Sequence, residues 1–390
     1  MYNVKTLNSI SAPALQKLDG DKYAVSPDFE NPDAILVRSA KMHDMEFNKE
    51  LLCIARAGAG VNNIPLDRCA DEGIIVFNTP GANAEAVKEL VLCSMLLSSR
   101  DVIGGIDWVK TVVSEGDKIA ALVEKQKSEY VGPELFGKTL GVVGLGAIGA
   151  RVAHAAEALG MTVYGYDPYL SVDAAWRMSS SIIHAHDLDT IYKESDYISI
   201  HVPYIEATHH LFNKDSLAKM KPGVRIINLS RAELVNDDDM LAAIESGHVL
   251  QYVTDFPNGK TAGAPGVIAI PHLGASTPES EDNCANMACA EMIEYLENGN
   301  IINSVNMAGA YLPRTNGDPR LCVIHANEPG VISKITGTVS SFDVNIENMI
   351  NTGTKGRVAS YTMLDISALP DGLEEKVGKI DGVIRVRILL

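Results

Sequence analysis

The feature that most constrains this chain is a glycine-rich stretch placed between an apolar run and a helical pattern. Residues 139–143 are short, apolar and rich in β-branched side chains, which is typical of a buried parallel strand. Gly144, Gly146 and Gly149 follow in the spacing G-x-G-x-x-G. The first permits a tight turn, the second lets a phosphate group approach the backbone, and the third lets a helix lie close to the strand. That helix is predicted over residues 148–159.

A second strand is predicted at residues 162–166, and it ends at Asp167. A carboxylate there can accept hydrogen bonds from both ribose hydroxyls of NAD, and it would repel the additional phosphate of NADP. The N-terminus of the intervening helix offers unpaired N–H groups to the pyrophosphate. Glycines alone would be equally consistent with an ordinary turn. Strand, glycines, helix, strand and acid in this order predict that the chain binds NAD.

Charge and cysteine content narrow the class of protein. The chain has 33 Lys and Arg against 50 Asp and Glu, a net charge of −17, which disfavours nucleic acid and anionic membrane as partners. Its cysteines lie singly, with no C-x-x-C and no Cys/His spacing suited to zinc, so we expect reduced thiols and no metal site. The first residues lack a signal-peptide pattern, and no apolar run is long enough to span a bilayer. We therefore expect a cytoplasmic protein.

The alternation of short strands and helices predicts an α/β protein of several domains. We expect a flavodoxin-like substrate-binding domain over 1–97, completed by 279–308, and a Rossmann NAD-binding domain over 98–278. A linker rich in Asn, Gly and Pro is expected at 309–319. The βαββαβ pattern of the tail, 320–390, is typical of a ferredoxin-like unit.

Polar residues that follow the strands of the first domain are candidates for substrate binding. Ligands of open parallel sheets sit beyond the carboxyl ends of the strands. This rule selects Arg38, Ser39, Arg56, the Gly58–Gly60 turn and Asn83. The arginines could equally be surface cations, and the glycines could merely shape a turn. A pair of arginines would nevertheless attract an anionic substrate in spite of the negative net charge.

Two residues of the second domain have the chemistry that hydroxyl oxidation requires. NAD takes the hydride, so the protein must supply a base for the hydroxyl proton and a cation for the oxygen and a neighbouring carboxylate. Histidine titrates near neutrality, and the arginine fork binds a carboxylate through two hydrogen bonds. Arg231 and His272 each follow a predicted strand of one sheet, at the edge where the nicotinamide should lie. We expect this pair to be catalytic; a surface cation and a loop histidine are the alternatives.

A series of motifs resembles the D-isomer-specific 2-hydroxyacid dehydrogenase family. These motifs, which match in order and spacing, are Gly137–Gly149, Asp167, His201–Pro203, Asn228–Arg231, Asp255 and Pro271–Thr277. Other stretches look like the branch of the family that oxidises 3-phospho-D-glycerate, namely residues 36–40, 56–63, 77–80 and the tail. The resemblance covers nearly the whole chain.

The resemblance implies roles for individual residues. Arg231 would bind the carboxylate and the reacting oxygen, and His272 would be the acid and base. Ala59 and Gly60 would offer backbone N–H groups to the carboxylate, and Asp255 would contact the nicotinamide carboxamide. The positions that match the family's NAD site are Gly144, Gly146, Ala147, Ile148, Gly149, Asp167, His201, Val202, Pro203, Thr208, Leu229, Ser230, Arg231, Asp255, His272 and Gly274.

One departure from the family concerns the partner of the histidine. The family usually follows its aspartate with a motif ending in Glu-Pro, and that glutamate pairs with the catalytic histidine. Here residues 255–261 read Asp-Phe-Pro-Asn-Gly-Lys-Thr, with no glutamate before His272. A paired carboxylate would stabilise the charged imidazole and fix its tautomer. Either another residue replaces it, with Glu279 and Glu281 as candidates, or His272 works without a carboxylate partner.

The tail resembles the regulatory ACT domain of the same branch. In serine-binding relatives, residues matching His325, Asn327 and Asn345 hold L-serine, so the resemblance implies L-serine as an effector. One strand of this tail is expected over residues 357–366.

The expected function is the NAD-dependent oxidation of 3-phospho-D-glycerate to 3-phosphohydroxypyruvate, the first step of L-serine biosynthesis. The resemblance also implies a homodimer or homotetramer. Two alternatives remain: a reductase of glyoxylate or hydroxypyruvate, and a non-catalytic sensor of NAD or an amino acid.

Overall fold

The computed structural model describes residues 1–314, 317–353 and 359–390. Two expectations fall partly on the remaining residues: Thr315 and Asn316 belong to the expected linker, and Arg357 begins an expected strand. These three positions, and Val358 of the same expected strand, lie outside the described residues. The described chain forms two compact units, of which one contains 1–83 and 278–390 and the other contains 84–277. The expected domain boundaries near residues 97 and 320 stay predictions.

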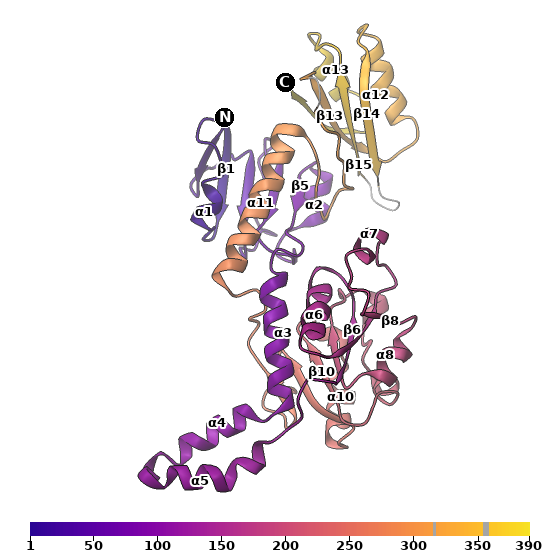
Figure 1. Ribbon diagram of the computed structural model, residues 1–390. Helices are drawn as coiled ribbons and strands as arrows, with labels where there is room; N and C mark the ends of the chain where they lie inside the picture. The colour runs from indigo at the N-terminus through magenta and orange to yellow at the C-terminus, as the bar shows by residue number, and fades with distance from the viewer. Residues whose placement is uncertain (315–316, 354–358) are drawn as a thin grey trace. The chain divides into compact units, whose positions relative to one another are not determined.

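The first unit contains a parallel five-stranded sheet with the order β2-β1-β3-β4-β5. Its strands are β1 (Tyr2–Leu7), β2 (Tyr23–Ser26), β3 (Ala34–Val37), β4 (Cys53–Arg56) and β5 (Ile75–Phe77). The helices beside it are α1 (Ala12–Leu15), α2 (Leu66–Asp71) and the long α11 (Pro278–Asn298), which lies along the sheet (Figure 1). Strand β3 is buried throughout, because parallel sheets are covered on both faces. The strand order is the flavodoxin-like one that the sequence predicts.

The tail of the first unit is an antiparallel sheet with the order β14-β15-β13-β16. Its elements are β13 (Arg320–Ala326), α12 (Val331–Ser340), β14 (Ile346–Gly353), β15 (Ala359–Ile366), α13 (Leu373–Gly378) and β16 (Val383–Leu389). This is the βαββαβ order that the sequence predicts. Leu321, Val323 and Leu364 pack with residues of the two helices, such as Ile335 and Val377, into one apolar core.

The other face of the tail's sheet packs against the first sheet and α11. Cys322 and Tyr361 of the tail belong to the same buried apolar cluster as Tyr295 of α11. The hydroxyl of Tyr361 donates to the Gly299 carbonyl at 2.7 Å, and the Arg387 guanidinium lies 4.7 Å from the centre of the Tyr295 ring. The tail and the N-terminal sheet therefore share one core.

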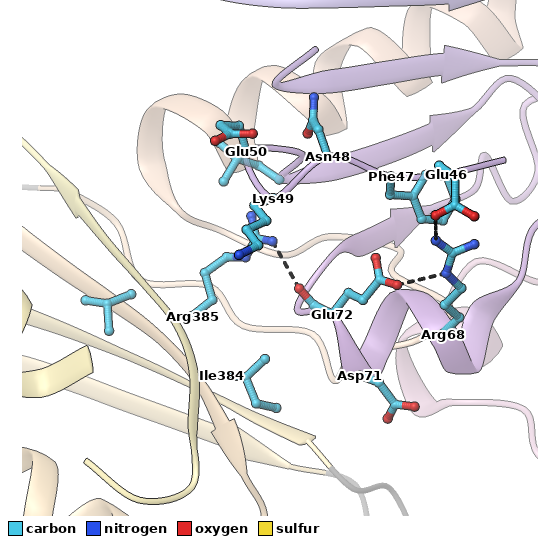
Figure 2. A pocket seen from close by; sticks show the side chains of 12 residues that line it. Glu46, Phe47, Asn48, Lys49, Glu50, Arg68, Asp71, Glu72, Ile384 and Arg385 are labelled. Atoms are coloured by element: carbon cyan, nitrogen blue, oxygen red, sulfur yellow. Dashed lines mark hydrogen bonds and ion pairs between the residues drawn. The ribbon is translucent and has the colours of Figure 1, made fainter. Parts of the chain in front are cut away.

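A groove of about 670 Å³ lies where β16 approaches the loops of the first sheet (Figure 2). Its guanidinium groups are already engaged by the protein. Arg385 donates from Nη1 to the Leu51 carbonyl at 2.7 Å and from Nη2 to the Glu72 carbonyl at 3.0 Å. Arg68 pairs with the Glu72 carboxylate at 2.8 Å. The two bonds from Arg385 connect β16 of the tail to the first sheet across the groove.

The second unit is a parallel seven-stranded sheet with the order β12-β11-β10-β9-β6-β7-β8. Its strands are β6 (Thr139–Val143), β7 (Thr162–Tyr166), β8 (Ile183–His184), β9 (Tyr197–Ile200), β10 (Val224–Asn228), β11 (Val249–Thr254) and β12 (Val267–Ala269). Its α-helices are α3 (Ala84–Ser99), α4 (Val102–Thr111), α5 (Ile119–Gln126), α6 (Ala147–Ala158), α7 (Val172–Ala175), α8 (Leu188–Glu194), α9 (Lys214–Leu217) and α10 (Asp237–Glu245). Numbered from β6, this is the Rossmann order with an additional strand at one edge.

Helices α4 and α5 form an arm that extends away from the rest of this unit (Figure 1). No residue of α4 or α5 is buried, although α4 exposes Ile106 and Val109. The sequence predicts this stretch only as part of the NAD-binding domain and gives no helix for it. Among the residues described, none of the helices combines the length and apolar character that crossing a bilayer requires.

Candidate functional site

The turn after β6 has room for glycine alone at two of its three glycine positions. Gly144 has φ +92°, and a Cβ there would lie 2.7 Å from the His201 carbonyl oxygen. A Cβ at Gly149 would lie 1.9 Å from the Gly144 carbonyl oxygen, so α6 packs directly on the turn. A Cβ at Gly146 would meet no described atom within 4 Å, which leaves open space beside the backbone there. This geometry suits the close approach of a pyrophosphate.

The start of α6 and the end of β7 complete the features that NAD requires. Gly146 precedes the first residue of α6 and has no side chain to cap it, so N–H groups of the first turn remain for an anion. The Asp167 carboxylate is oriented by two backbone donors, Leu145 N–H to Oδ2 and Tyr169 N–H to Oδ1, both at 2.9 Å. The residues present therefore fit a dinucleotide, and Asp167 is placed to receive ribose hydroxyls.

Arg231 follows β10 in a turn whose backbone is held by the buried side-chain amide of Asn228. Asn228, which is fully buried, donates from Nδ2 to the Arg231 carbonyl at 2.8 Å and accepts from the Ser230 N–H at 3.2 Å. The Ser230 hydroxyl donates to the Ile200 carbonyl of β9 at 2.6 Å. The Arg231 side chain is exposed, and its Nη1 donates to the Ser230 carbonyl at 2.6 Å. The backbone of the turn is fixed while its guanidinium faces solvent.

Asp255 and His272 follow the next two strands of the same sheet, β11 and β12. Because β10, β11 and β12 are parallel neighbours, Arg231, Asp255 and His272 gather at one edge of the sheet. Asp255 is 1% exposed, and the backbone N–H groups of Asp255 itself and of Gly274 interact with its carboxylate. Burial raises the pKa of Asp255, and the charges of His272 and Arg231 oppose that rise. The His272 ring lies 4.7 Å from the Phe256 ring.

The other expected NAD-site residues line the ends of β9 and its loop. Burial lowers the pKa of His201 to about 4, and its Nε2 lies 2.8 Å from the Ser199 hydroxyl. At neutral pH the imidazole of His201 is therefore uncharged and keeps a single N–H proton. Thr208 closes the loop, because its hydroxyl donates to the Pro203 carbonyl at 2.8 Å. Three further positions of the expected set lie nearby in this sheet: Val202 packs on the core, Leu229 is buried, and Gly274 is buried beside Asp255.

The expected substrate-side residues of the first unit lie at the carboxyl ends of β3 and β4. Arg38 pairs with Glu281 of α11 at 2.6 Å. Burial raises the pKa of the Cys284 thiol of α11, and the charges of Arg56 and Arg38 both oppose the rise. Gly58 has φ +152°, and a Cβ there would lie 2.3 Å from Nη1 of Arg56, so the guanidinium packs on the bare glycine.

Ser39 and Asn83 are the other two expected substrate-side residues. The Ser39 N–H donates to the side chain of Asn8 at 2.9 Å, and Asn83 is half-buried immediately before α3. Glu281, a candidate partner for His272, is engaged by Arg38.

The backbone N–H groups of Ala59 and Gly60 have no acceptor among the described residues. The turn that carries them is held instead through its carbonyl groups. Asn78, directly after β5, donates from Nδ2 to the Ala59 carbonyl at 2.6 Å. Asn78 belongs to the stretch 77–80 that resembles the family, but the sequence analysis gives it no role. Its position at the end of a third neighbouring strand is the signal that would have found it.

The expected serine-binding residues of the tail do not meet within one chain. His325 is buried, and its Nε2 lies 2.8 Å from the Thr362 hydroxyl. Asn327 is exposed just beyond β13. Asn345 is exposed at the opposite end of the sheet, because β14 begins opposite Ile366 whereas His325 lies opposite Ser360.

Comparisons with known proteins agree with this geometry. A family model described as the NAD binding domain of the D-isomer specific 2-hydroxyacid dehydrogenases matches residues 93–274. A D-3-phosphoglycerate dehydrogenase of Bacillus subtilis is 35% identical over 284 residues, covering 70% of this chain and 51% of that protein. A hydroxypyruvate reductase of Thermotoga maritima is 38% identical over 261 residues, covering 64% of this chain and 80% of that protein.

A relative from Haemophilus influenzae, named D-3-phosphoglycerate dehydrogenase, is 30% identical over 362 residues and covers 88% of this chain and 83% of its own length. The solved structure of NAD+-bound 3-phosphoglycerate dehydrogenase from Entamoeba histolytica has the same fold, with a TM-score of 0.60 at 22% identity over 80% of this chain and 99% of that one. The chain spans about half the length of several relatives, including the one from Bacillus. With matches of this extent and the NAD-binding turn in place, the chain belongs to the D-isomer-specific 2-hydroxyacid dehydrogenase family.

Proposed function

We propose that the chain oxidises 3-phospho-D-glycerate to 3-phosphohydroxypyruvate with NAD, as the entry step to L-serine. The observation that carries the proposal is the convergence of Arg231, Asp255 and His272 at the ends of three neighbouring strands. The same sheet carries the NAD-binding turn at the end of β6. Relatives from Bacillus and Haemophilus that bear the name of this activity add support.

Each residue of this cluster has a distinct task. When bound, NAD supplies the acceptor for the hydride that leaves the substrate carbon. His272 takes the hydroxyl proton, and Arg231 holds the carboxylate and the oxygen on which negative charge develops. Asp255 supplies the negative charge that stabilises the imidazolium once His272 is protonated. This role is additional to the contact with the nicotinamide carboxamide that the resemblance implies for Asp255.

Recognition of the substrate anions is assigned to the first unit. The free N–H groups of Ala59 and Gly60 suit a carboxylate, which accepts hydrogen bonds through both oxygens. Arg56 and Arg38, whose charges both act on Cys284, suit a phosphate. Ser39 and Asn83 stand at the same strand-end edge or just after it and complete the proposed substrate set.

Reduction of hydroxypyruvate or glyoxylate is the second candidate. It is favoured by the 38% identical relative named hydroxypyruvate reductase. It is also favoured by the Arg38–Glu281 ion pair, because that carboxylate competes with a substrate phosphate for the guanidinium.

Absorbance of NADH separates these functions. The proposed enzyme forms NADH from 3-phospho-D-glycerate, a reductase consumes NADH only with glyoxylate or hydroxypyruvate, and a non-catalytic sensor does neither. Arg231→Ala and His272→Ala should each lower turnover by about 100-fold or more. His184→Ala, an exposed histidine of β8, is the matched control and should leave turnover unchanged. Full activity in His272→Ala would exclude it as the base.

We also propose that the tail binds L-serine and that the chain acts as a homodimer or homotetramer in the cytosol. All six cysteines are free, which suits a reducing compartment. His325 and Asn345 lie at opposite ends of one sheet, so a site using both with Asn327 needs two tails. The arm of α4 and α5, which buries no residue of its own, suits pairing with a second copy.

Light scattering and inhibition assays test these two additions. The wild type should elute as a dimer or larger, and Ile106→Lys on the arm should shift it toward monomer. L-serine should inhibit the wild type but not Asn345→Ala. A monomeric wild type, or one that is indifferent to L-serine at millimolar concentration, would remove the corresponding proposal.

A further inference from the structure

A line of hydrogen bonds in the first unit connects α11 with the turn at residues 58–60. Glu291 of α11 accepts at Oε1 from the Asn303 side chain at 2.6 Å. The Asn303 carbonyl accepts from the backbone N–H of Asn78 at 3.4 Å. The Asn78 side chain then donates to the Ala59 carbonyl at 2.6 Å. Residues far apart in the chain thus meet at the turn that carries the free N–H groups.

Peptide planarity turns these carbonyl contacts into control of the N–H groups. The Ala59 carbonyl and the Gly60 N–H belong to one planar trans peptide and point in opposite directions. The bond from Asn78 to the Ala59 carbonyl therefore sets the direction of the Gly60 N–H. In the same way, the Thr79 N–H donates to the Gly58 carbonyl at 3.2 Å and sets the direction of the Ala59 N–H. Both N–H directions are determined by residues 78 and 79.

The carbonyl of Asn303 can accept from Asn78 only while Asn303 keeps its backbone conformation. Its φ is 56°, in the left-handed region that few residues other than glycine adopt, although asparagine is one of those that tolerate it. Glu291 is 5% exposed and lies within α11, so it is a rigid acceptor for the Asn303 side chain. The next residues of the segment run antiparallel beside β5, with Ser304 opposite Phe77. Glu291 thus holds Asn303 in the one conformation that presents its carbonyl to Asn78.

We propose that Asn78 is a positioning residue that aims the Gly60 N–H at the substrate carboxylate, and that Glu291 and Asn303 hold Asn78 in place. This inference rests on the proposed role of the 58–60 turn in carboxylate binding. It does not depend on the identity of the rest of the substrate, since every 2-hydroxy acid carries that carboxylate.

Kinetics of Asn78 variants provide the first test. The wild type is offered 3-phospho-D-glycerate, D-glycerate and D-lactate with NAD, and glyoxylate and hydroxypyruvate with NADH, and the best substrate is kept. Asn78→Ala should raise the KM for that acid about 10-fold, with kcat and the KM for the cofactor within about threefold. Asn78→Asp should be at least as impaired, because an ionised carboxylate has no donor for the Ala59 carbonyl.

Asn306→Ala is the matched control for these variants. Asn306 is a buried amide that ties the same segment to β5, with Nδ2 donating to the Ile74 carbonyl at 2.8 Å and Oδ1 accepting from the Val76 N–H at 2.9 Å. Its loss should lower thermal stability and leave the KM for the acid unchanged. An equal rise of KM in Asn306→Ala and Asn78→Ala would show a general packing effect and overturn the proposal.

Glu291 variants separate a hydrogen-bonding role from simple burial. Glu291→Ala removes the acceptor for Asn303 and should reproduce the raised KM of Asn78→Ala. Glu291→Gln keeps an amide oxygen in the same place and should restore the wild-type KM. If Glu291→Gln raises the KM for the acid as much as Glu291→Ala does, the acceptor oxygen of residue 291 does not hold Asn303 and Asn78 in place, and this part of the proposal is wrong.

Hydrogen exchange of the turn gives a readout that is independent of turnover. Measured residue by residue, the Ala57 and Gly58 amides, which donate to the Val37 and Arg56 carbonyls, should exchange about tenfold faster in Asn78→Ala than in the wild type, and at the wild-type rate in Asn306→Ala. Unchanged exchange in Asn78→Ala would overturn the proposal. A wild type that turns over none of the acids would remove the proposed function, while the exchange result would still decide whether Asn78 holds the turn.

Discussion

Two buried carboxylates, one in each unit, show how surroundings decide what a buried acid does. Asp255 lies at a sheet edge with the charges of Arg231 and His272 beside it, and those charges oppose the rise that burial imposes on its pKa. Glu291 lies in α11, where its partner is the neutral amide of Asn303, and burial raises its pKa to about 8. Near neutral pH, cations favour the ionised form of the first, whereas the second is mostly protonated. One carboxylate is equipped for chemistry and the other for structure.

The largest effect is expected at a third buried carboxylate, Asp365, which has a direct arginine partner. Arg320 is 0% exposed and contacts Asp365 through Nε at 2.7 Å and Nη2 at 3.1 Å. Arg320→Ala would leave the acid buried without its cation and should lower the free energy of unfolding by about 3–5 kcal/mol. Urea denaturation measures the loss.

The double variant Arg320→Leu with Asp365→Leu is the control for that loss. It removes both charges and should recover most of the stability. A single variant that costs less than about 1 kcal/mol would mean that the cation is not what makes the buried acid tolerable.

Removal of the charge of Asp255 should chiefly affect catalysis. Asp255→Asn keeps the shape of the side chain but leaves the His272 imidazolium without its negative neighbour, so kcat/KM should fall about 100-fold. Because the pKa of Asp255 is raised, wild-type activity should decline as pH falls through that raised pKa, and the Asn variant should lack this dependence. Asp238 is an exposed acid that pairs with Lys260 in the same unit, so Asp238→Asn should leave kcat/KM unchanged. Rates equal to the wild type in Asp255→Asn would show that the charge of Asp255 does not assist His272.

Glu291 should show the opposite behaviour, with an effect on stability and little effect on rate for the amide variant. Its folded pKa of about 8 exceeds its ordinary 4.5, so the folded state holds the proton more tightly than the unfolded state. The stability that this proton contributes is fully present below pH 4.5 and is lost as pH rises toward 8. Glu291→Gln should therefore be more stable than the wild type at pH 9, by at least about 2 kcal/mol, and similar to it at pH 5.

Urea unfolding at the two pH values tests this dependence. Glu294→Gln, one turn further along α11 and hydrogen-bonded to Asn298 and Asn300, is the matched control and should show no such dependence. If the free energy of unfolding differs between the wild type and Glu291→Gln by the same amount at pH 5 and pH 9, Glu291 does not titrate between these pH values.

The smallest effect is expected where a carboxylate and its cation are both exposed. The side chains of Arg38 and Glu281 are 41% and 44% exposed, so Glu281→Gln should change stability by less than about 0.5 kcal/mol. It would release Arg38 from its carboxylate and should lower the KM for a phosphorylated acid about twofold, with no change for an unphosphorylated one. A rise of that KM would indicate that Arg38 does not meet the phosphate.

The NAD-binding turn could be predicted from sequence almost to the residue, because local rules govern it. The strands predicted at 139–143 and 162–166 are confirmed as β6 and β7, and the helix predicted at 148–159 is α6, displaced by one residue. Apolar runs bounded by glycines determine these elements with little help from the rest of the chain. By contrast, the helices of the arm were not predicted, although Val102, Ile103, Ile106 and Val109 give α4 an apolar period of helical spacing.

The residues that depend on tertiary packing could not be found in this way. Glu291 looks like any polar residue of an amphipathic helix, and its burial arises only when α11 packs in the first unit. Asn78 gains its contact with Ala59 from the neighbouring positions of β4 and β5 in the sheet. Arg231 and His272 were proposed as a catalytic pair from their strand-end positions, and that pairing stays a prediction until their variants are assayed.

The shared core of the tail and the N-terminal sheet has a consequence for biosynthesis. Strands β1 to β5 leave the ribosome first, yet Cys322, Tyr361 and Leu389 of the same apolar cluster are made last. The middle segment, 84–277, can collapse on its own while the opening segment waits with apolar surface uncovered. During translation, the N-terminal sheet therefore completes its apolar core only after the tail has been made.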